Sequence, residues 1–281
     1  MAAGLAHLLA NERGLVSGTD PEFLHQARVA LRRLRSALEV FSPPLPESVV
    51  APVERELKWM ASRLGPARDW DVFMTETLPP IEAEFGARRG LKPLRARCNR
   101  LRRSAGADAR RAARSARYRR LTLRLSAWLA AESWRAFPNG TVRAALQGPV
   151  GNHARTVLQA RYGRVRKRGR GLEKLSAARL HRLRIAIKRF RYAADFFSGL
   201  YRGKAVQETL QRLSRLQDVL GALNDSATAV DLAVRVCRGR GAGSLLEARG
   251  ILLGWNRARA APLKKELNDA WRAFSEAGTF W

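Results

Sequence analysis

A gap-free internal repeat constrains the fold of this chain more than any other feature. The segment LHQARVALRRLR, which begins at Leu24, recurs as LHRLRIAIKRFR from Leu180, an offset of 156 residues. The same offset pairs further identical residues over some 45 positions: Phe41 with Phe197, Leu57 with Leu213, Leu64-Gly65 with Leu220-Gly221, and Asp69 with Asp225. The repeat predicts two similar halves, residues 1–138 and 143–281, joined near Pro138-Asn139-Gly140 in a pseudo-two-fold arrangement.

Hydrophobic residues recur at helical spacing along the chain, which predicts an all-α fold. Asp20 followed by Pro21 is typical of a helix start. Strong breaks are expected at Ser42-Pro43-Pro44, Pro79-Pro80, Pro138-Asn139-Gly140 and Gly239 to Gly243. The expected helices are 20–41, 47–64, 68–84, 90–115, 117–134, 143–170, 176–199, 204–221, 225–238 and 243–275, and some of these could be continuous.

The repeated segment places its cations on one side of a helix. At 100° per residue, His25, Arg28, Arg32 and Arg35 fall within about 80° of arc and span ~15 Å of axis. The opposite side carries a predicted core stripe: Leu24, Ala27, Leu31, Leu34, Leu38 and Phe41. Like charges at i and i+4 destabilise a helix by a few tenths of a kcal/mol, so an unmixed basic face indicates an anionic ligand.

The second copy repeats this face with His181, Arg184, Lys188 and Arg191, while Arg33 and Arg189 point to the flank. Similar but weaker spacing is found in three further sets, which are secondary candidates for ligand contact: Arg117 with Arg120 and Arg124, Arg161 with Arg164 and Arg168, and Arg257 with Lys264. Each histidine heads its basic face, which favours ligand contact or a structural role there. Metal binding is not expected, because no partner at ligand spacing accompanies either histidine.

The charge balance limits the partners of the chain. Lys and Arg number 53 against 24 acidic residues, a formal net charge of +29. Such an excess opposes compaction and favours a polyanionic partner such as nucleic acid, anionic lipid or a phosphate polymer. Cys98 and Cys237 lie too far apart for a CxxC metal or redox motif. A membrane span and a signal peptide are not expected, which favours a cytoplasmic location.

The repeated motif resembles that of the CHAD domain, the conserved histidine α-helical domain. The resemblance rests on LHxLRxxxKRxRY at 180–192 and LHxxRxxxRRxR at 24–35, and on Leu-Gly followed by Asp69 or Asp225. Tyr118-Arg119-Arg120-Leu121 leading to Trp128 also fits, and the likeness covers nearly the whole chain. It implies a single CHAD-like domain over residues 1–281, built as two four-helix bundles with pseudo-two-fold symmetry around a central basic groove or pore.

The resemblance also implies a partner, inorganic polyphosphate, and an association with polyphosphate granules, without a cofactor. Carried over by position, the polyphosphate-binding residues would be His25, Arg28, Arg32, Arg33, Arg35, His181, Arg184, Lys188, Arg189 and Arg191. Many CHAD proteins carry a triphosphate-tunnel domain marked by ExExK on a strand. Glu54-Arg55-Glu56-Leu57-Lys58 matches that pattern, but it lies in a predicted helix, where the two glutamates point apart.

Two other functions, RNA binding and catalysis, fit the sequence less well. RNA binding by the same basic faces is the main alternative, but single-strand binders add stacking aromatics. In the two motifs only Tyr192 is expected to be available for stacking on a base, because Phe41, Phe190 and Phe197 are predicted to lie in the core. Catalysis is not expected: the chain has no GxxxxGK[ST] loop. The nearest carboxylate pairs, Asp69 with Asp71 and Asp218 with Asp225, are better explained by capping, by turns after Leu-Gly, or by pairing with a motif arginine.

Overall fold

The computed structural model describes residues 1–42, 45–86, 88, 90–132, 140–238 and 242–281. Within these residues every regular element is helical, so the predicted all-α class is confirmed. The chain forms two compact units, Met1–Gly148 and Pro149–Trp281. This division falls after the join expected at residues 138–143, of which 138 and 139 lie outside the described residues.

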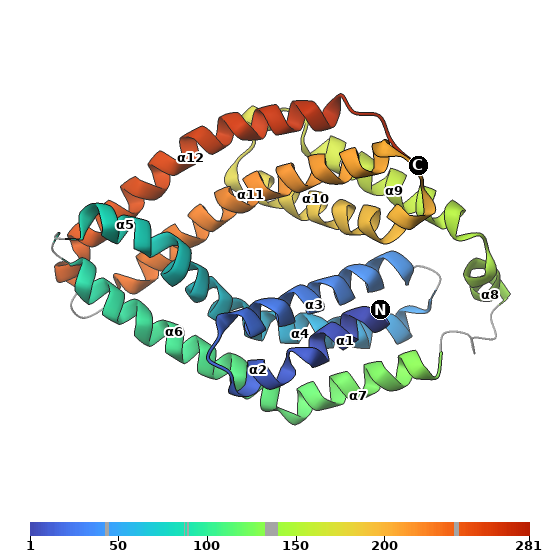
Figure 1. The fold of residues 1–281 in the computed structure, drawn as a ribbon, viewed down its shortest axis with the longest axis horizontal. Coiled ribbons are helices and arrows are strands. Elements are labelled where there is room, and N and C mark those ends of the chain that lie inside the picture. The colour runs from blue at the N-terminus through green and yellow to red at the C-terminus, as the bar shows by residue number, and fades with distance from the viewer. Residues whose placement is uncertain (43–44, 87, 89, 133–139, 239–241) are drawn as a thin grey trace. The chain divides into compact units, whose positions relative to one another are not determined.

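The first unit is organised around the helix of the first motif. Its elements are α1 (Ala2–Ala10), α2 (Glu12–Ser17), α3 (Pro21–Phe41), α4 (Glu47–Val72), a π-helical turn (Phe73–Thr77), α5 (Leu78–Phe85), α6 (Leu91–Arg114), α7 (Ala116–Ala130) and α8 (Gly140–Gln147). Helix α3 packs against α1 and α4, and α4 also packs against α6 and α7 (Figure 1). The helix that carries the first basic face therefore has helical partners on its other sides.

The second unit is built in the same way around the second motif. It contains α9 (Val150–Arg168), a 3₁₀ turn (Leu172–Lys174), α10 (Ala177–Phe197), a 3₁₀ turn (Ser198–Leu200), α11 (Lys204–Val236), a 3₁₀ turn (Ala242–Leu245) and α12 (Leu246–Ser275). Helix α10 packs against α9 and α11, and α11 runs along α12. The long orange and red ribbons in Figure 1 are α11 and α12.

The motif helices begin and bury their apolar sides largely as the sequence predicts. The Asp20 carboxylate accepts a hydrogen bond of 2.8 Å from the Glu22 backbone N–H, and Pro21 opens α3. The Ser176 hydroxyl caps α10 in the same way, through Arg179 N–H. Leu31 and Leu34 have no exposed surface. Each Leu buried in this way contributes about 1.5–3 kcal/mol, which holds the basic face outward.

The prediction that Phe41 belongs to the core stripe is wrong. Phe41 is 40% exposed, whereas its repeat partner Phe197 is 1% exposed. Helix α3 ends at Phe41, so that ring lies at the end of the helix. Phe197 instead meets the His153 ring from α9 at 5.9 Å in a T-shaped contact.

The turns expected after Leu64-Gly65 and Leu220-Gly221 are also wrong. Helix α4 continues through Gly65 to Val72, and α11 continues through Gly221 to Val236. Leu64 is fully buried and Leu220 is 2% exposed. Packing of these leucines outweighs the roughly 1 kcal/mol that an interior glycine costs a helix.

Helical structure also persists where the Pro79-Pro80 break is expected. The π-helical turn Phe73–Thr77 leads directly into α5, whose first turn holds both prolines. A proline in the first turn of a helix costs little, because that N–H has no partner within the helix. Pro149 separates α8 from α9, so the single helix expected over 143–170 is two helices. Among the described helices, none has the length and apolarity needed to cross a bilayer.

Candidate polyanion-binding site

The α3 basic face consists of His25, Arg28, Arg32 and Arg35, with Arg33 on its flank. Arg33 is exposed and the other four are half-buried. Their stems therefore lie along the helix surface while their polar ends reach its edge, as long cationic side chains commonly do. The Nε atom of Arg35 is buried and makes no hydrogen bond within the described residues.

Arg28 is held against α4. Its Nη1 donates to the Ala61 carbonyl at 3.4 Å, and a side chain on Gly65 would bring a Cβ within 3.3 Å of that nitrogen. Burial lowers the pKa of Arg28, and the Asp69 carboxylate acts in the opposite direction. Gly65 thus leaves space for the guanidinium, and Asp69 compensates part of its charge. The turn expected at Asp69 is wrong, because α4 continues to Val72; pairing with a motif arginine stays a prediction that this electrostatic attraction favours.

His25 lies in a strongly positive environment. Burial lowers its pKa, and the charge of Arg68 on α4 lowers it further; Glu22 opposes this, while Arg32 and Arg28 add to it. Arg68 itself makes a 3.5 Å ion pair with Glu76. A neutral imidazole at this place can donate or accept one hydrogen bond without adding to the repulsion.

The α10 basic face is anchored differently at its histidine. His181 Nδ1 donates to Asn224 Oδ1 at 3.1 Å, and Asn224 Nδ2 donates to Asp225 Oδ1 at 3.3 Å. Asn224 and Asp225 belong to α11, the partner of α10 in the helical pair. This chain of bonds fixes the orientation of the exposed imidazole relative to α11.

The cations of α10 follow the same pattern of exposure as those of α3. Arg184, Lys188 and Arg191 are half-buried and Arg189 is exposed. The apolar residues Leu183, Ile187 and Phe190, which alternate with these cations along α10, each have no exposed surface. Both motif helices therefore combine a buried apolar side with a row of four polar or cationic groups, as the repeat predicts.

Sequence reasoning missed one position of the repeat that lies beside the motif histidine in each unit. This position is residue 68 in the first unit and residue 224 in the second. Arg68 acts on His25 and Asn224 bonds His181. The offset of 156 relates these two residues, but their side chains differ, so a search for identical pairs passes over them. The two histidines consequently have different neighbours, one a cation and the other an amide.

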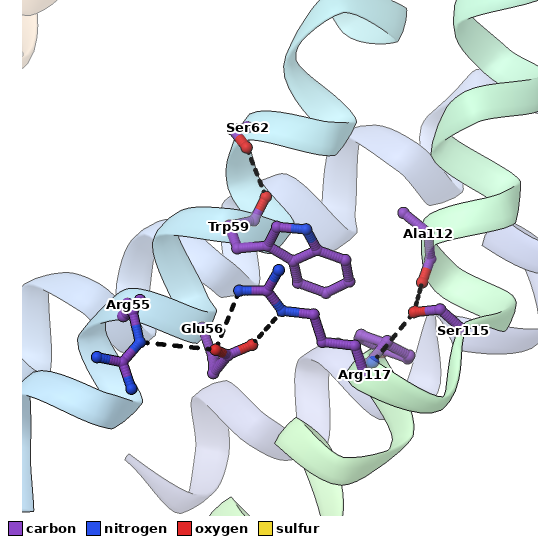
Figure 2. Close-up of polar contacts among 8 residues, drawn as sticks. Arg55, Glu56, Trp59, Ser62, Ala112, Ser115 and Arg117 are labelled. Atoms are coloured by element: carbon purple, nitrogen blue, oxygen red, sulfur yellow. Dashed lines mark hydrogen bonds and ion pairs between the residues drawn. The ribbon is translucent and has the colours of Figure 1, made fainter.

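The secondary cations divide by environment. Arg117 on α7 forms a bidentate ion pair with Glu56 on α4: its Nε donates to Oε2 at 2.7 Å and its Nη2 donates to Oε1 at 3.1 Å. Its guanidinium lies 4.3 Å from the centre of the Trp59 ring (Figure 2). Arg117 therefore ties α7 to α4. Arg120 and Arg124 line a shallow pocket of about 260 Å³ beside this bond.

The ExExK-like segment lies within α4, as expected. Glu54 makes a 2.8 Å ion pair with Lys58 one turn along the helix, while Glu56 turns to Arg117. The two glutamates therefore do not share a face. They do not form the carboxylate row that the strand version of this motif presents.

The remaining secondary cations are on unit two. Arg161 is 7% exposed, so it lies in the interior and is separated from Arg164, which is exposed on the same helix. Arg168 donates from Nη1 to the Arg182 carbonyl at 3.0 Å, which links the end of α9 to α10. Lys264 is exposed on α12.

The CHAD domain family matches residues 1–234. The crystal structure of the CHAD domain from the plant Ricinus communis superposes with a TM-score of 0.82 at 34% identity, covering 100% of this chain and 91% of that one. PptA from Streptomyces chartreusis shares the fold, with a TM-score of 0.72 at 18% identity and coverage of 96% and 95%. A comparison with curated proteins finds no match. With the repeated basic helices in place and this match over most of its length, the chain belongs to the CHAD domain family.

Proposed function

We propose that this protein binds inorganic polyphosphate along the basic faces of α3 and α10. The observation that carries the proposal is the recurrence of one arrangement in both units: a helix with a buried apolar side and four aligned polar or cationic groups. The resemblance of the repeated motif to the CHAD signature supports the same ligand. The proposal includes a cytoplasmic location at polyphosphate granules and no catalytic step.

The chemistry of the polymer suits these faces. Polyphosphate carries about one negative charge per unit and has no bases to read, so a row of cations is sufficient for recognition. Guanidinium groups bind phosphate oxygens in a bidentate manner and are weakly hydrated, which lowers the cost of the contact. Arg28 is already oriented by Ala61 and Gly65, so less side-chain entropy is lost when it binds.

RNA binding remains the alternative because its electrostatic part would be the same. The aromatic side chains of the motif helices favour polyphosphate. Phe190 and Phe197 are buried, and Tyr192 stacks on Phe196 with ring centres 6.3 Å apart. Phe41 is exposed but lies at the far end of α3, away from His25.

The proposal is tested with Arg32→Glu and Lys188→Glu in one protein. These equivalent residues lie in the middle of each basic face, and we expect at least a hundredfold weaker binding of long-chain polyphosphate at fixed salt. Each lost phosphate contact should also reduce the slope of log K against log salt by about 0.7–0.9. Circular dichroism checks folding, and the milder Arg32→Gln with Lys188→Gln should retain the fold with an intermediate loss.

The matched control is Arg13→Glu with Arg259→Glu, which changes the net charge equally at exposed positions off both faces. If the control weakens binding as much as the test variant, binding depends on total charge and the proposed site is wrong. The same proteins are titrated with structured RNA and duplex DNA. A preference for RNA at the same salt would replace polyphosphate by the alternative.

A further inference from the structure

A basic pocket lies in the second unit, and its lining includes none of the residues of the α10 basic face. It has a volume of about 610 Å³ and is formed by the loop between α9 and α10 and the last turns of α12. Its lining includes four cations, one aromatic ring and one hydroxyl: Arg166, Arg170, Lys174, Arg272, Trp271 and Ser275. The size falls within the range of pockets for small organic ligands.

The walls of this pocket are fixed by contacts within the unit. Arg166 Nη1 donates to the Ser275 carbonyl at 2.9 Å, which joins the end of α9 to the end of α12. The benzene part of Trp271 lies so close to Gly169 that a Cβ there would come within 2.0 Å of it. Gly171 has φ of +63°, so it turns the loop in a conformation that a side chain would strain. The ring and the loop are therefore positioned before any ligand arrives.

The charges in the pocket are not balanced from within. Glu173 is the acidic residue of its lining, and its Oε1 accepts a hydrogen bond from Asn268 at 3.4 Å. The Ser275 Oγ is buried and has no hydrogen-bond partner among the described residues. The lining therefore carries four cations against one carboxylate, and this excess of positive charge favours an anionic ligand.

The first unit has a related pocket of about 470 Å³ at the equivalent place in the repeat. The offset of 156 maps its lining segment, residues 14–21, onto residues 170–177. There Arg102 makes a 2.6 Å ion pair with Asp71, and Arg114 donates to the Val16 carbonyl at 2.8 Å. The lining of the first pocket includes two carboxylates, those of Asp20 and Asp71, whereas the lining of the second includes one, that of Glu173. The second pocket is thus the better anion site.

We infer that the pocket between the α9–α10 loop and the end of α12 binds a small phosphorylated molecule. Arg170, Lys174 and Arg272 would hold its phosphate oxygens through charge-assisted hydrogen bonds. Trp271 offers a planar surface for a ring attached to the phosphate, as aromatic side chains do for bases. The inference is independent of polyphosphate binding by the motif helices.

The test uses the full chain with ADP and inorganic pyrophosphate as probes, in calorimetric titrations at physiological salt. Lys174→Glu with Arg272→Glu should weaken binding of at least one probe more than tenfold. The control, Arg259→Glu with Lys265→Glu, makes the same charge change at exposed positions of α12 outside the pocket. If circular dichroism shows that the two charge reversals reduce folding, the milder variant Lys174→Gln with Arg272→Gln is used in their place.

The outcomes separate this site from the motif helices. The variant Arg32→Glu with Lys188→Glu should retain ADP and pyrophosphate binding, whereas the pocket variant should retain binding of long-chain polyphosphate. If ADP binds more tightly than pyrophosphate and this difference disappears in Trp271→Leu, the ligand is a nucleotide. If the two probes bind equally, the pocket recognises the phosphate group alone. Equal weakening by the pocket and control variants, or no binding of either probe to the unaltered protein, overturns the inference.

Discussion

At the scale of single residues, the two motif histidines differ although the repeat makes them equivalent. Burial and the charge of Arg68 lower the pKa of His25, which favours its neutral form in the free protein. His181 instead donates to Asn224 on α11. A polyanion bound beside His25 would offset the surrounding arginines and raise the pKa of this histidine.

The pH dependence of stability follows from the lowered pKa of His25. The unfolded chain has a histidine pKa of about 6.5 and therefore takes up a proton before the folded state does. The free energy of unfolding should decrease as the pH falls below about 6.5, and the decrease should end below the folded pKa. Urea unfolding between pH 8 and pH 5 measures this slope, which should be shallower in His25→Gln.

Ligand binding should reverse the effect on His25. Because a bound polyanion raises the pKa, affinity for polyphosphate should increase as the pH falls from 7.5 to 6, by at most about tenfold for each unit that the pKa rises. An unchanged pH profile in His25→Gln would show that His25 does not contact the polymer.

Gly65 and Gly221 are equivalent in the repeat but differ in what surrounds them. A Cβ on Gly65 would lie 3.3 Å from Arg28 Nη1, whereas nothing lies within 4 Å of one on Gly221. Gly221→Ala should therefore stabilise the protein by about 0.5–1 kcal/mol through helix propensity alone. Gly65→Ala should gain less than this, because the Arg28 guanidinium must shift. Thermal unfolding of both variants measures the difference, and equal gains would contradict the role given to Gly65.

At the scale of elements, the repeat predicts where helices begin better than where they end. The first turns of α3 and α10 follow from local capping by Asp20 and Ser176. The continuity of α4 and α11 does not, because a glycine followed by polar residues reads locally as a break. Contacts from neighbouring helices, which have no local signal, keep Leu64 and Leu220 buried within one unbroken helix.

The ends of the two motif helices provide a paired test of packing. Phe197→Ala removes a ring that is 1% exposed, so it should cost about 3–5 kcal/mol of stability. Phe41→Ala removes a ring that is 40% exposed and should cost about 1 kcal/mol or less. Chemical unfolding followed by circular dichroism compares them; similar costs would mean that Phe41 is as well packed as its counterpart.

At the scale of the whole molecule, the formal net charge of +29 governs both stability and binding. Self-repulsion among the cations opposes the compact state and is screened within about 8–10 Å at physiological salt. Stability of the free protein should therefore increase when NaCl is raised from 10 to 150 mM, by about 2–4 °C in Tm for each kcal/mol of repulsion removed. Scanning calorimetry measures this, and a Tm that falls with salt would show that attractive ion pairs dominate instead.

Patterns along the chain are enough to predict the all-α class, the internal repeat and the side of each motif helix that carries the cations. These follow from local periodicity, capping and an offset that can be read along the chain. Three features depend on contacts between helices: Gly65 leaves space for the Arg28 guanidinium, residues 68 and 224 give the histidines different neighbours, and Trp271 packs on Gly169 to form a pocket wall. Each of these joins residues far apart in sequence, and their contacts depend on how side chains from separate helices fill the space between them.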